Sequence, residues 1–245
     1  MSQLLNVIEV EKQFMNCNAL NGVNMSIAEG QIVGLLGPNA SGKTTLLKII
    51  AGLQQPTTGN VMYRHKDVGL DEEVSSINGR SMVSFCPDVM KYPGWMKVKD
   101  AFKFYEDLYP DYKQERANEL IKVLELESIM NARVSSLSKG MSERLTLALT
   151  FSRDTKLYML DEPLDGIDPV GKMKVIDAIL AFKPENASVL LSTHLVKDIE
   201  RILDSVYFLS KGKIIFNGLC DEIREKEDKT VEQTYLEVFI REGTF

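Results

Sequence analysis

The pattern of apolar and polar positions predicts short strands towards both ends of the chain. Alternation with period two predicts strands at Asn6 to Phe14 and Val23 to Ile27, with a turn near Asn21-Gly22. The continuous apolar run from Gln31 to Leu36 predicts a buried strand, and helical periodicity follows it from Lys43 to Ala51. The other predicted strands are Asn60 to Tyr63, Lys156 to Leu160, Ser188 to Leu191, and a closing hairpin of Ser205 to Leu209 with Ile214 to Phe216.

In the middle of the chain the apolar residues recur with helical spacing instead. The predicted helices are Val98 to Leu108, Tyr112 to Leu124 and Ser142 to Phe151. The order of elements predicts one domain of the α/β class, whose core (residues 1–86 and 155–220) is interrupted by a helical subdomain (87–154). Residues 221–245 form a charged tail, which we expect to be helical.

Composition excludes several classes of protein. The net charge of −6 argues against a nucleic-acid partner, which would need a basic face. Cys17, Cys86 and Cys220 are odd in number and show no CxxC spacing, which favours a reducing cytosol over a disulfide scaffold. The N-terminus does not read as a signal peptide, and no apolar run reaches the roughly 18 residues of a membrane span. A role at a membrane would therefore require a partner.

A glycine-rich motif follows the predicted buried strand. The segment GPNASGKTT fits the pattern G-x-x-x-x-G-K-[ST], in which glycines let successive N–H groups face a phosphate. Lys43 would bring positive charge to the β- and γ-phosphates, and Thr44 would offer a hydroxyl to Mg²⁺. The residues predicted to bind phosphate are Gly37, Pro38, Asn39, Ala40, Ser41, Gly42, Lys43, Thr44 and Thr45, named here the phosphate loop.

Two carboxylates end the strand LYMLDE. Asp161 would hold Mg²⁺ through water, and Glu162 would polarise the attacking water. The alternative is that both acids cap the helix that follows, but the phosphate loop favours the catalytic interpretation. His194, at the end of SVLLST, is either a structural residue or a catalytic one in the same sheet.

The segment LSKGM precedes an apolar helix. Ser138 and Gly140 could bind an anion at the helix N-terminus. Taken alone, however, the segment reads more simply as a helix start with a serine cap.

In this order the motifs closely resemble the nucleotide-binding subunit of ABC transporters, over nearly the whole chain. GPNASGKTT resembles the Walker A loop, LYMLDE resembles Walker B, and LSKGM resembles the signature segment, usually LSGGQ. Asp165 to Pro169 (DGIDP) resembles the D-loop, and His194 the switch histidine. Phe14 matches the aromatic residue that stacks on adenine; the less favoured alternative is an ordinary core or surface residue. The resemblance implies a RecA-like P-loop NTPase core with an N-terminal antiparallel β region, ATP and Mg²⁺ as ligands, and Lys43, Glu162 and His194 as catalytic residues.

Four positions depart from the family pattern. Lys139 replaces the second signature glycine, Met141 replaces the signature glutamine, and Asp165 replaces a small D-loop residue. Asp88 stands where the Q-loop glutamine is expected and could ligate Mg²⁺. LSKGM with an acid at the Q-loop is similar to the ATPases of bacterial exporters.

The resemblance implies a partner on each of two sides. One is a second ATPase subunit, either a second copy or a related chain, whose signature segment would close each ATP site. The other is a multi-span membrane permease, which would hold this cytoplasmic chain at the inner face of the cell membrane. We expect this permease to dock near Asp88 to Tyr105, where Met90, Tyr92, Trp95 and Met96 lie close together. The alternatives to an exporter ATPase are an importer ATPase and a soluble ABC ATPase that does not serve transport.

Overall fold

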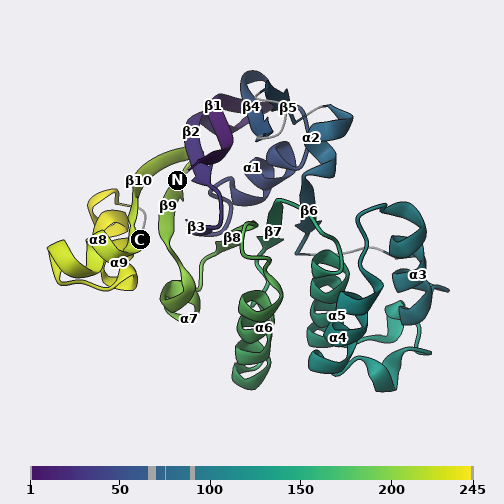
Figure 1. Ribbon diagram of the computed structural model, residues 1–245. Coiled ribbons are helices and arrows are strands. Elements are labelled where there is room, and N and C mark those ends of the chain that lie inside the picture. The colour runs from purple at the N-terminus through teal and green to yellow at the C-terminus, as the bar shows by residue number, and fades with distance from the viewer. Residues whose placement is uncertain (1, 66–69, 75, 89–91, 244–245) are drawn as a thin grey trace.

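The computed structural model describes residues 2–65, 70–74, 76–88 and 92–243 of the chain. It contains two sheets (Figure 1). The first is antiparallel, with strand order β2-β1-β4-β5; its strands are β1 (Gln3–Phe14), β2 (Cys17–Ala28), β4 (Thr58–His65) and β5 (Leu70–Glu73). The second has the order β10-β9-β3-β8-β7-β6, parallel from β9 to β6. Its strands are β3 (Ile32–Leu36), β6 (Val83–Cys86), β7 (Leu157–Asp161), β8 (Ser188–Thr193), β9 (Ser205–Ser210) and β10 (Lys213–Leu219).

Helices lie on several sides of these sheets. Figure 1 shows α3, α4 and α5 together at one side of the molecule, and α8 and α9 at the opposite side. The helices are α1 (Lys43–Ile50), α2 (Ile77–Ser81), α3 (Val98–Leu108), α4 (Gln114–Val123), α5 (Lys139–Phe151), α6 (Pro169–Phe182), α7 (Val196–Ile199), α8 (Cys220–Glu227) and α9 (Val231–Arg241). The predicted α/β fold, with an antiparallel N-terminal region and helices inserted between two core strands, is confirmed.

The parallel strands are apolar throughout because both faces of their sheet are covered. In β3, Ile32 and Leu36 pack into one hydrophobic cluster, whereas Val33 and Leu35 pack into the other. In β7, Tyr158 and Leu160 pack into the first cluster, and Leu157 and Met159 pack into the second. Residues on opposite faces of one strand thus serve two cores, which explains a continuous apolar run in place of strict alternation.

The turn predicted at Asn21-Gly22 is wrong. Strand β2 runs through both residues, and the hairpin turn lies between Phe14 and Cys17. Asn21 and Gly22 form a bulge, because the register shifts there and Gly22 has a φ of 70°. The side chain of Asn21 donates a hydrogen bond to the carbonyl oxygen of Lys211 at 2.9 Å, so this bulge ties β2 to the hairpin of β9 and β10.

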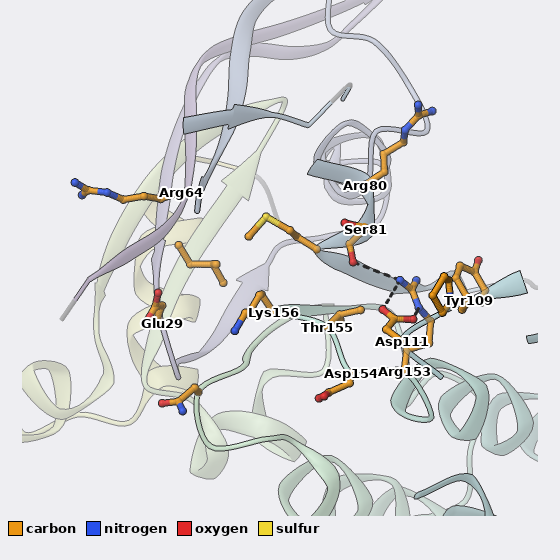
Figure 2. Close-up of a pocket in the computed structure, with 14 residues that line it drawn as sticks. Glu29, Arg64, Arg80, Ser81, Tyr109, Asp111, Arg153, Asp154, Thr155 and Lys156 are labelled. Atoms are coloured by element: carbon orange, nitrogen blue, oxygen red, sulfur yellow. Dashed lines mark hydrogen bonds and ion pairs between the residues drawn. The ribbon is translucent and has the colours of Figure 1, made fainter. Parts of the chain in front are cut away.

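A buried arginine joins the helical segment to the core. Arg153, just after α5, pairs with Asp111 at 2.9 and 3.0 Å and donates to the carbonyl oxygen of Val83 at 2.9 Å. Its guanidinium lies 3.9 Å from the centre of the Tyr109 ring. Figure 2 shows this arrangement in the wall of a cavity of about 730 Å³. The cavity lies at the amino ends of the parallel strands, where Met82 and Lys156 precede β6 and β7.

Replacing Arg153 with alanine is expected to lower the free energy of unfolding by about 3 kcal/mol, because Asp111 and a buried carbonyl lose their partner. Chemical denaturation measures this change. The matched control is Arg80→Ala, an exposed arginine that lines the same cavity, with an expected effect within about 0.5 kcal/mol. Equal destabilisation by both variants would contradict the role of Arg153 as the link.

Candidate active site

The phosphate loop connects the carboxyl end of β3 to the start of α1. Its backbone is left-handed at Ala40 (φ 61°) and Gly42 (φ 112°). A Cβ atom at Gly42 would lie 2.6 Å from the carbonyl oxygen of Ala19, and one at Gly37 would clash with that of Leu209. Both glycines are therefore required by close backbone contacts as well as by the shape of the loop.

The loop borders an open cavity of about 690 Å³. This volume lies in the range of small-molecule sites, roughly 300–1,000 Å³. The lining residues come from six separate parts of the chain: Cys17, Asn18, Ala19, Asn39, Ala40, Ser41, Gly42, Lys43, Thr44, Thr45, Asp88, Glu162, Asp165, His194, Lys211 and Gly212.

Two features of the loop fit a phosphate group. The buried hydroxyl of Ser41 has no hydrogen-bond partner among the described residues. The start of α1 at Gly42 also has no side-chain cap, so its N–H groups are available to a ligand. A phosphate oxygen would accept hydrogen bonds from these donors, and the positive end of the helix would favour its charge.

Glu162 is held between two basic groups. Its Oε1 lies 3.1 Å from Lys43 Nζ, and its Oε2 lies 3.1 Å from His194 Nδ1. Lys43 is buried and also donates to the carbonyl oxygens of Gly37 and Pro38 at 2.7 and 3.0 Å. Glu162 itself has a left-handed backbone (φ 50°), which turns the chain sharply after β7. The three predicted catalytic side chains are thus in direct contact.

Two of the three predicted metal ligands line the same cavity, and the third, Asp161, directly precedes the lining residue Glu162. Asp161 is buried at the end of β7, and its Oδ1 accepts a hydrogen bond from Ser192 Oγ at 2.6 Å. Thr44 and Asp88 line the cavity, and burial raises the pKa of Asp88 while Lys139 opposes that shift. Among the described residues, no group of three His, Cys, Asp or Glu side chains is placed to hold a metal ion. Mg²⁺ does not require such a group, because it is commonly bound by one or two carboxylates together with waters and substrate phosphates.

Six of the predicted ligand-binding residues lie outside the lining of this cavity: Phe14, Gly37, Pro38, Ser138, Gly140 and Asp161. Phe14, 45% exposed, ends β1 and pairs with Cys17, which does line the cavity. Ser138 caps α5, where its Oγ accepts a hydrogen bond from the N–H of Met141 at 3.3 Å. Gly140 faces open space, since no heavy atom lies within 4 Å of a Cβ built there. The structure therefore shows the helix-cap role of Ser138 and leaves the anion-binding role as a prediction.

The sequence motifs miss five of the lining residues: Cys17, Asn18, Ala19, Lys211 and Gly212. They come from the start of β2 and from the turn between β9 and β10. Asn21 holds these two segments together across a separation of 190 residues. No local signal in the sequence indicates this contact.

The sequence profile of the ABC transporter family matches residues 20–165. The chain belongs to this family. It is an ATP-binding subunit of an ABC transporter and an ATPase. No helix among the described residues is long and apolar enough to span a membrane.

Individual relatives agree with the family match. The chain is 30% identical over 240 residues to the ABC transporter ATP-binding protein YdbJ of Bacillus subtilis, which covers 96% of this chain and 74% of that protein. It is 28% identical over 225 residues to the lantibiotic transport ATP-binding protein SrtF of Streptococcus pyogenes, covering 92% of this chain and 95% of SrtF.

Solved structures share the fold. The structure of an ATP-binding subunit of an ABC transporter superposes with a TM-score of 0.84 at 25% identity, covering 96% of this chain and 99% of that one. The dimeric structure of MJ0796, a bacterial ABC transporter cassette, has a TM-score of 0.76 at 22% identity, covering 88% of this chain and 98% of that one.

Proposed function

We propose that this chain hydrolyses Mg-ATP with Lys43, Glu162 and His194 and that it drives export through a separate membrane subunit. The observation that carries the catalytic part is the contact of Glu162 with both Lys43 and His194 beside the phosphate loop. A carboxylate placed there can orient water, and a lysine at its side can reach the phosphates.

The contacts of Glu162 suggest the order of events at the site. Lys43 pairs with the Glu162 carboxylate. The β- and γ-phosphates of ATP carry more negative charge than this carboxylate, so Lys43 turns to them and releases Glu162 Oε1. Glu162 then orients the attacking water, while His194 keeps its contact with Oε2 and faces the γ-phosphate.

The chain offers ligands for a magnesium ion in the same place. The hydroxyl of Thr44 and the carboxylate of Asp161 would hold it, with Asp88 in reach of its water shell. When bound, Mg²⁺ neutralises charge on the phosphate oxygens. Phe14 would stack on the adenine ring from the end of β1. A nucleotide-bound structure with the base far from Phe14 would overturn that assignment.

We place the second half of each ATP site on another subunit. Ser138 and Gly140 lie outside the lining of the cavity that holds the phosphate loop, and Gly140 faces open space. A second ATPase subunit, docked head to tail, would bring its own Ser138 and Gly140 over the γ-phosphate. The dimeric MJ0796 cassette shows that this fold supports a dimer in a protein of the same family.

ATP should therefore drive dimer formation. In the Glu162→Gln protein, which retains ATP, Mg-ATP is expected to shift light scattering from monomer to dimer, and ADP is expected to reverse the shift, by mass action. Ser138→Arg should block the dimer, because its bulk and charge fall on the face that meets the partner. Loss of ATP binding by the Ser138→Arg monomer would contradict the shared site, since it would place Ser138 against the subunit's own ATP.

The direction of transport is inferred from two features. The signature segment LSKGM and the acid Asp88 at the Q-loop resemble those of bacterial exporter ATPases. SrtF, which the chain matches over 95% of its length, is a lantibiotic transport protein. We place the chain on the inner face of the cell membrane, bound to a multi-span permease.

The division into a core (1–86 and 155–220), a helical subdomain (87–154) and a tail (221–245) forms part of this proposal.

The segment predicted to meet the permease contains both buried and exposed anchors. Met96 is buried, and Tyr92 packs against the same core cluster as Met96, so both serve the interior. Trp95, by contrast, is 69% exposed. Met90 lies outside the described residues. An exposed tryptophan near the Q-loop position suits a docking contact, because aromatic side chains are enriched at interfaces.

Purification of the tagged chain from detergent-solubilised membranes tests this proposal. A multi-span membrane protein is expected to copurify with the wild-type chain and to be lost with Trp95→Glu, which leaves the fold intact because Trp95 is exposed. Recovery of the chain with ribosomes or in the soluble fraction alone would favour a soluble ABC ATPase instead.

A further inference from the structure

Two of the four departures from the family pattern contact each other within the chain. Lys139, in the signature segment, lies 2.6 Å from Asp165 Oδ2, in the D-loop. The two side chains are 49% and 45% exposed. Lys139 is the first residue of α5, and Asp165 lies in the loop between β7 and α6. The pair therefore joins the helical segment to the catalytic core in front of the ATP site.

A glycine makes room for this pair. Gly166 has a φ of 72°, and a Cβ atom there would lie 2.8 Å from Lys139 Nζ and 2.9 Å from its Cδ. The lysine stem thus lies against the backbone of the D-loop, where any L side chain would displace it. The lysine therefore contacts the D-loop through its stem as well as through its ion pair.

Three acids act on Lys139, namely Asp165, Glu143 and Asp88, and Asp165 contacts it most closely, at 2.6 Å. Glu143 Oε1 is also near, at 3.8 Å, but burial raises the pKa of Glu143 to about 7, so this carboxyl is only partly charged at neutral pH. The hydrogen bond from Lys139 lowers the pKa of Asp165, and the same bond raises the pKa of Lys139. Both members of the pair are therefore ionised near pH 7.

We infer that Lys139 exchanges Asp165 for the γ-phosphate of the ATP bound to the opposite subunit when the dimer closes. This inference rests on the proposed shared site. Lys139 stands between Ser138 and Gly140, so a signature segment that closes over a triphosphate carries this cation with it. The Lys139–Asp165 pair then competes with ATP-driven closure in the nucleotide-free subunit, and it re-forms once the γ-phosphate has left.

The exchange predicts opposite effects for the two members of the pair. In the Glu162→Gln background, Lys139→Gln is expected to raise the ATP concentration at half-maximal dimerisation about tenfold or more, since a charge-assisted contact to phosphate is lost. Asp165→Asn is expected to lower that concentration by about two- to fivefold, because it frees Lys139 from an exposed ion pair. Lys139→Arg keeps the positive charge, so its ATP concentration at half-maximal dimerisation should stay close to that of the protein with Lys139.

Glu125→Gln is the matched control. It removes an exposed carboxylate that pairs with Lys174 of α6 at 2.6 Å and with Arg144 of α5 at 3.1 Å. The dimerisation midpoint should not change in this variant. Light scattering across an ATP titration gives all four midpoints, and thermal unfolding verifies that each variant is folded.

The outcomes distinguish failure of the proposed Lys139 exchange from failure of the proposed shared ATP site. If Ser138→Arg abolishes the dimer while Lys139→Gln leaves the midpoint unchanged, the shared site stands and the role of Lys139 is rejected. A shift in the same direction for Lys139→Gln and Asp165→Asn would reduce the pair to a structural contact and would also reject the exchange. Absence of any ATP-driven dimer in the Glu162→Gln protein would overturn both proposals.

Discussion

Replacing Glu162 with glutamine is expected to lower ATP turnover by roughly 10²–10⁴-fold while ATP binding is retained, because the water-orienting carboxylate is lost. The substitution preserves the size of the side chain. It keeps an oxygen or nitrogen within reach of both Lys43 and His194, which lie 3.1 Å from the carboxylate. Release of phosphate measures turnover, and calorimetry measures binding of Mg-ATP.

The matched control for this change is Glu115→Gln, at an exposed position in the first turn of α4. It should hydrolyse ATP at the wild-type rate. Hydrolysis by Glu162→Gln within threefold of the wild type would assign the catalytic role to another residue, of which Asp161 is the nearest in sequence. A loss of ATP binding equal to the loss of turnover would also contradict the assignment, because it would make Glu162 a binding residue.

Local patterns predict the elements that build the active site. The apolar run before Gly37 is β3, the periodic run after it is α1, and LYML is most of β7. Each of these elements is defined by residues close together in the chain, whose periodicity reflects burial on one or two faces. For the same reason, the sequence places the phosphate loop after β3, Asp161 at the end of β7 and Glu162 directly after it, as the structure does.

Elements with mixed patterns escape such a prediction. The helix α6 (Pro169–Phe182) is absent from the sequence interpretation, although Asp168 caps it and Pro169 occupies its first turn. Its sequence combines Gly171 with β-branched residues, which weakens helical propensity, and packing against α4 and α5 supplies the missing stability. At Asn21-Gly22 the sequence predicts a turn that the structure lacks. Asn-Gly is a strong turn signal, but the pairing of β2 with β1 continues through it.

Contacts between distant segments lie beyond local patterns altogether. The sequence identifies Lys139 and Asp165 as two separate departures from the family, but only the fold shows that they pair. The contribution of Lys211 and Gly212 to the ATP cavity is of the same kind, since it depends on how the β9–β10 turn meets β2. These contacts are set by tertiary packing, which no window of neighbouring residues contains.

Replacing Lys43 with alanine is expected to weaken ATP binding by about one to two orders of magnitude, because charge-assisted hydrogen bonds to the phosphates contribute roughly 1.5–3 kcal/mol each. Lys43 is buried and donates to the carbonyl oxygens of Gly37 and Pro38, so its position in the loop is fixed before ATP arrives. Calorimetry with ATP measures the loss. AMP, which lacks the β- and γ-phosphates, serves as the control ligand, and its affinity should be the same for Lys43→Ala and the wild type.

The same variant has a second expected effect, on stability. Lys43 neutralises Glu162, whose side chain is only 13% exposed, so Lys43→Ala leaves a largely buried carboxylate with His194 as its remaining partner. The free energy of unfolding without nucleotide should therefore fall, and Glu162→Gln in the same protein should restore it by removing the uncompensated charge. Chemical denaturation of the single and double variants measures this coupling. Strictly additive effects on the free energy of unfolding would show that Lys43 and Glu162 do not interact in protein without nucleotide. Wild-type ATP affinity in Lys43→Ala would show that the phosphate loop does not bind ATP.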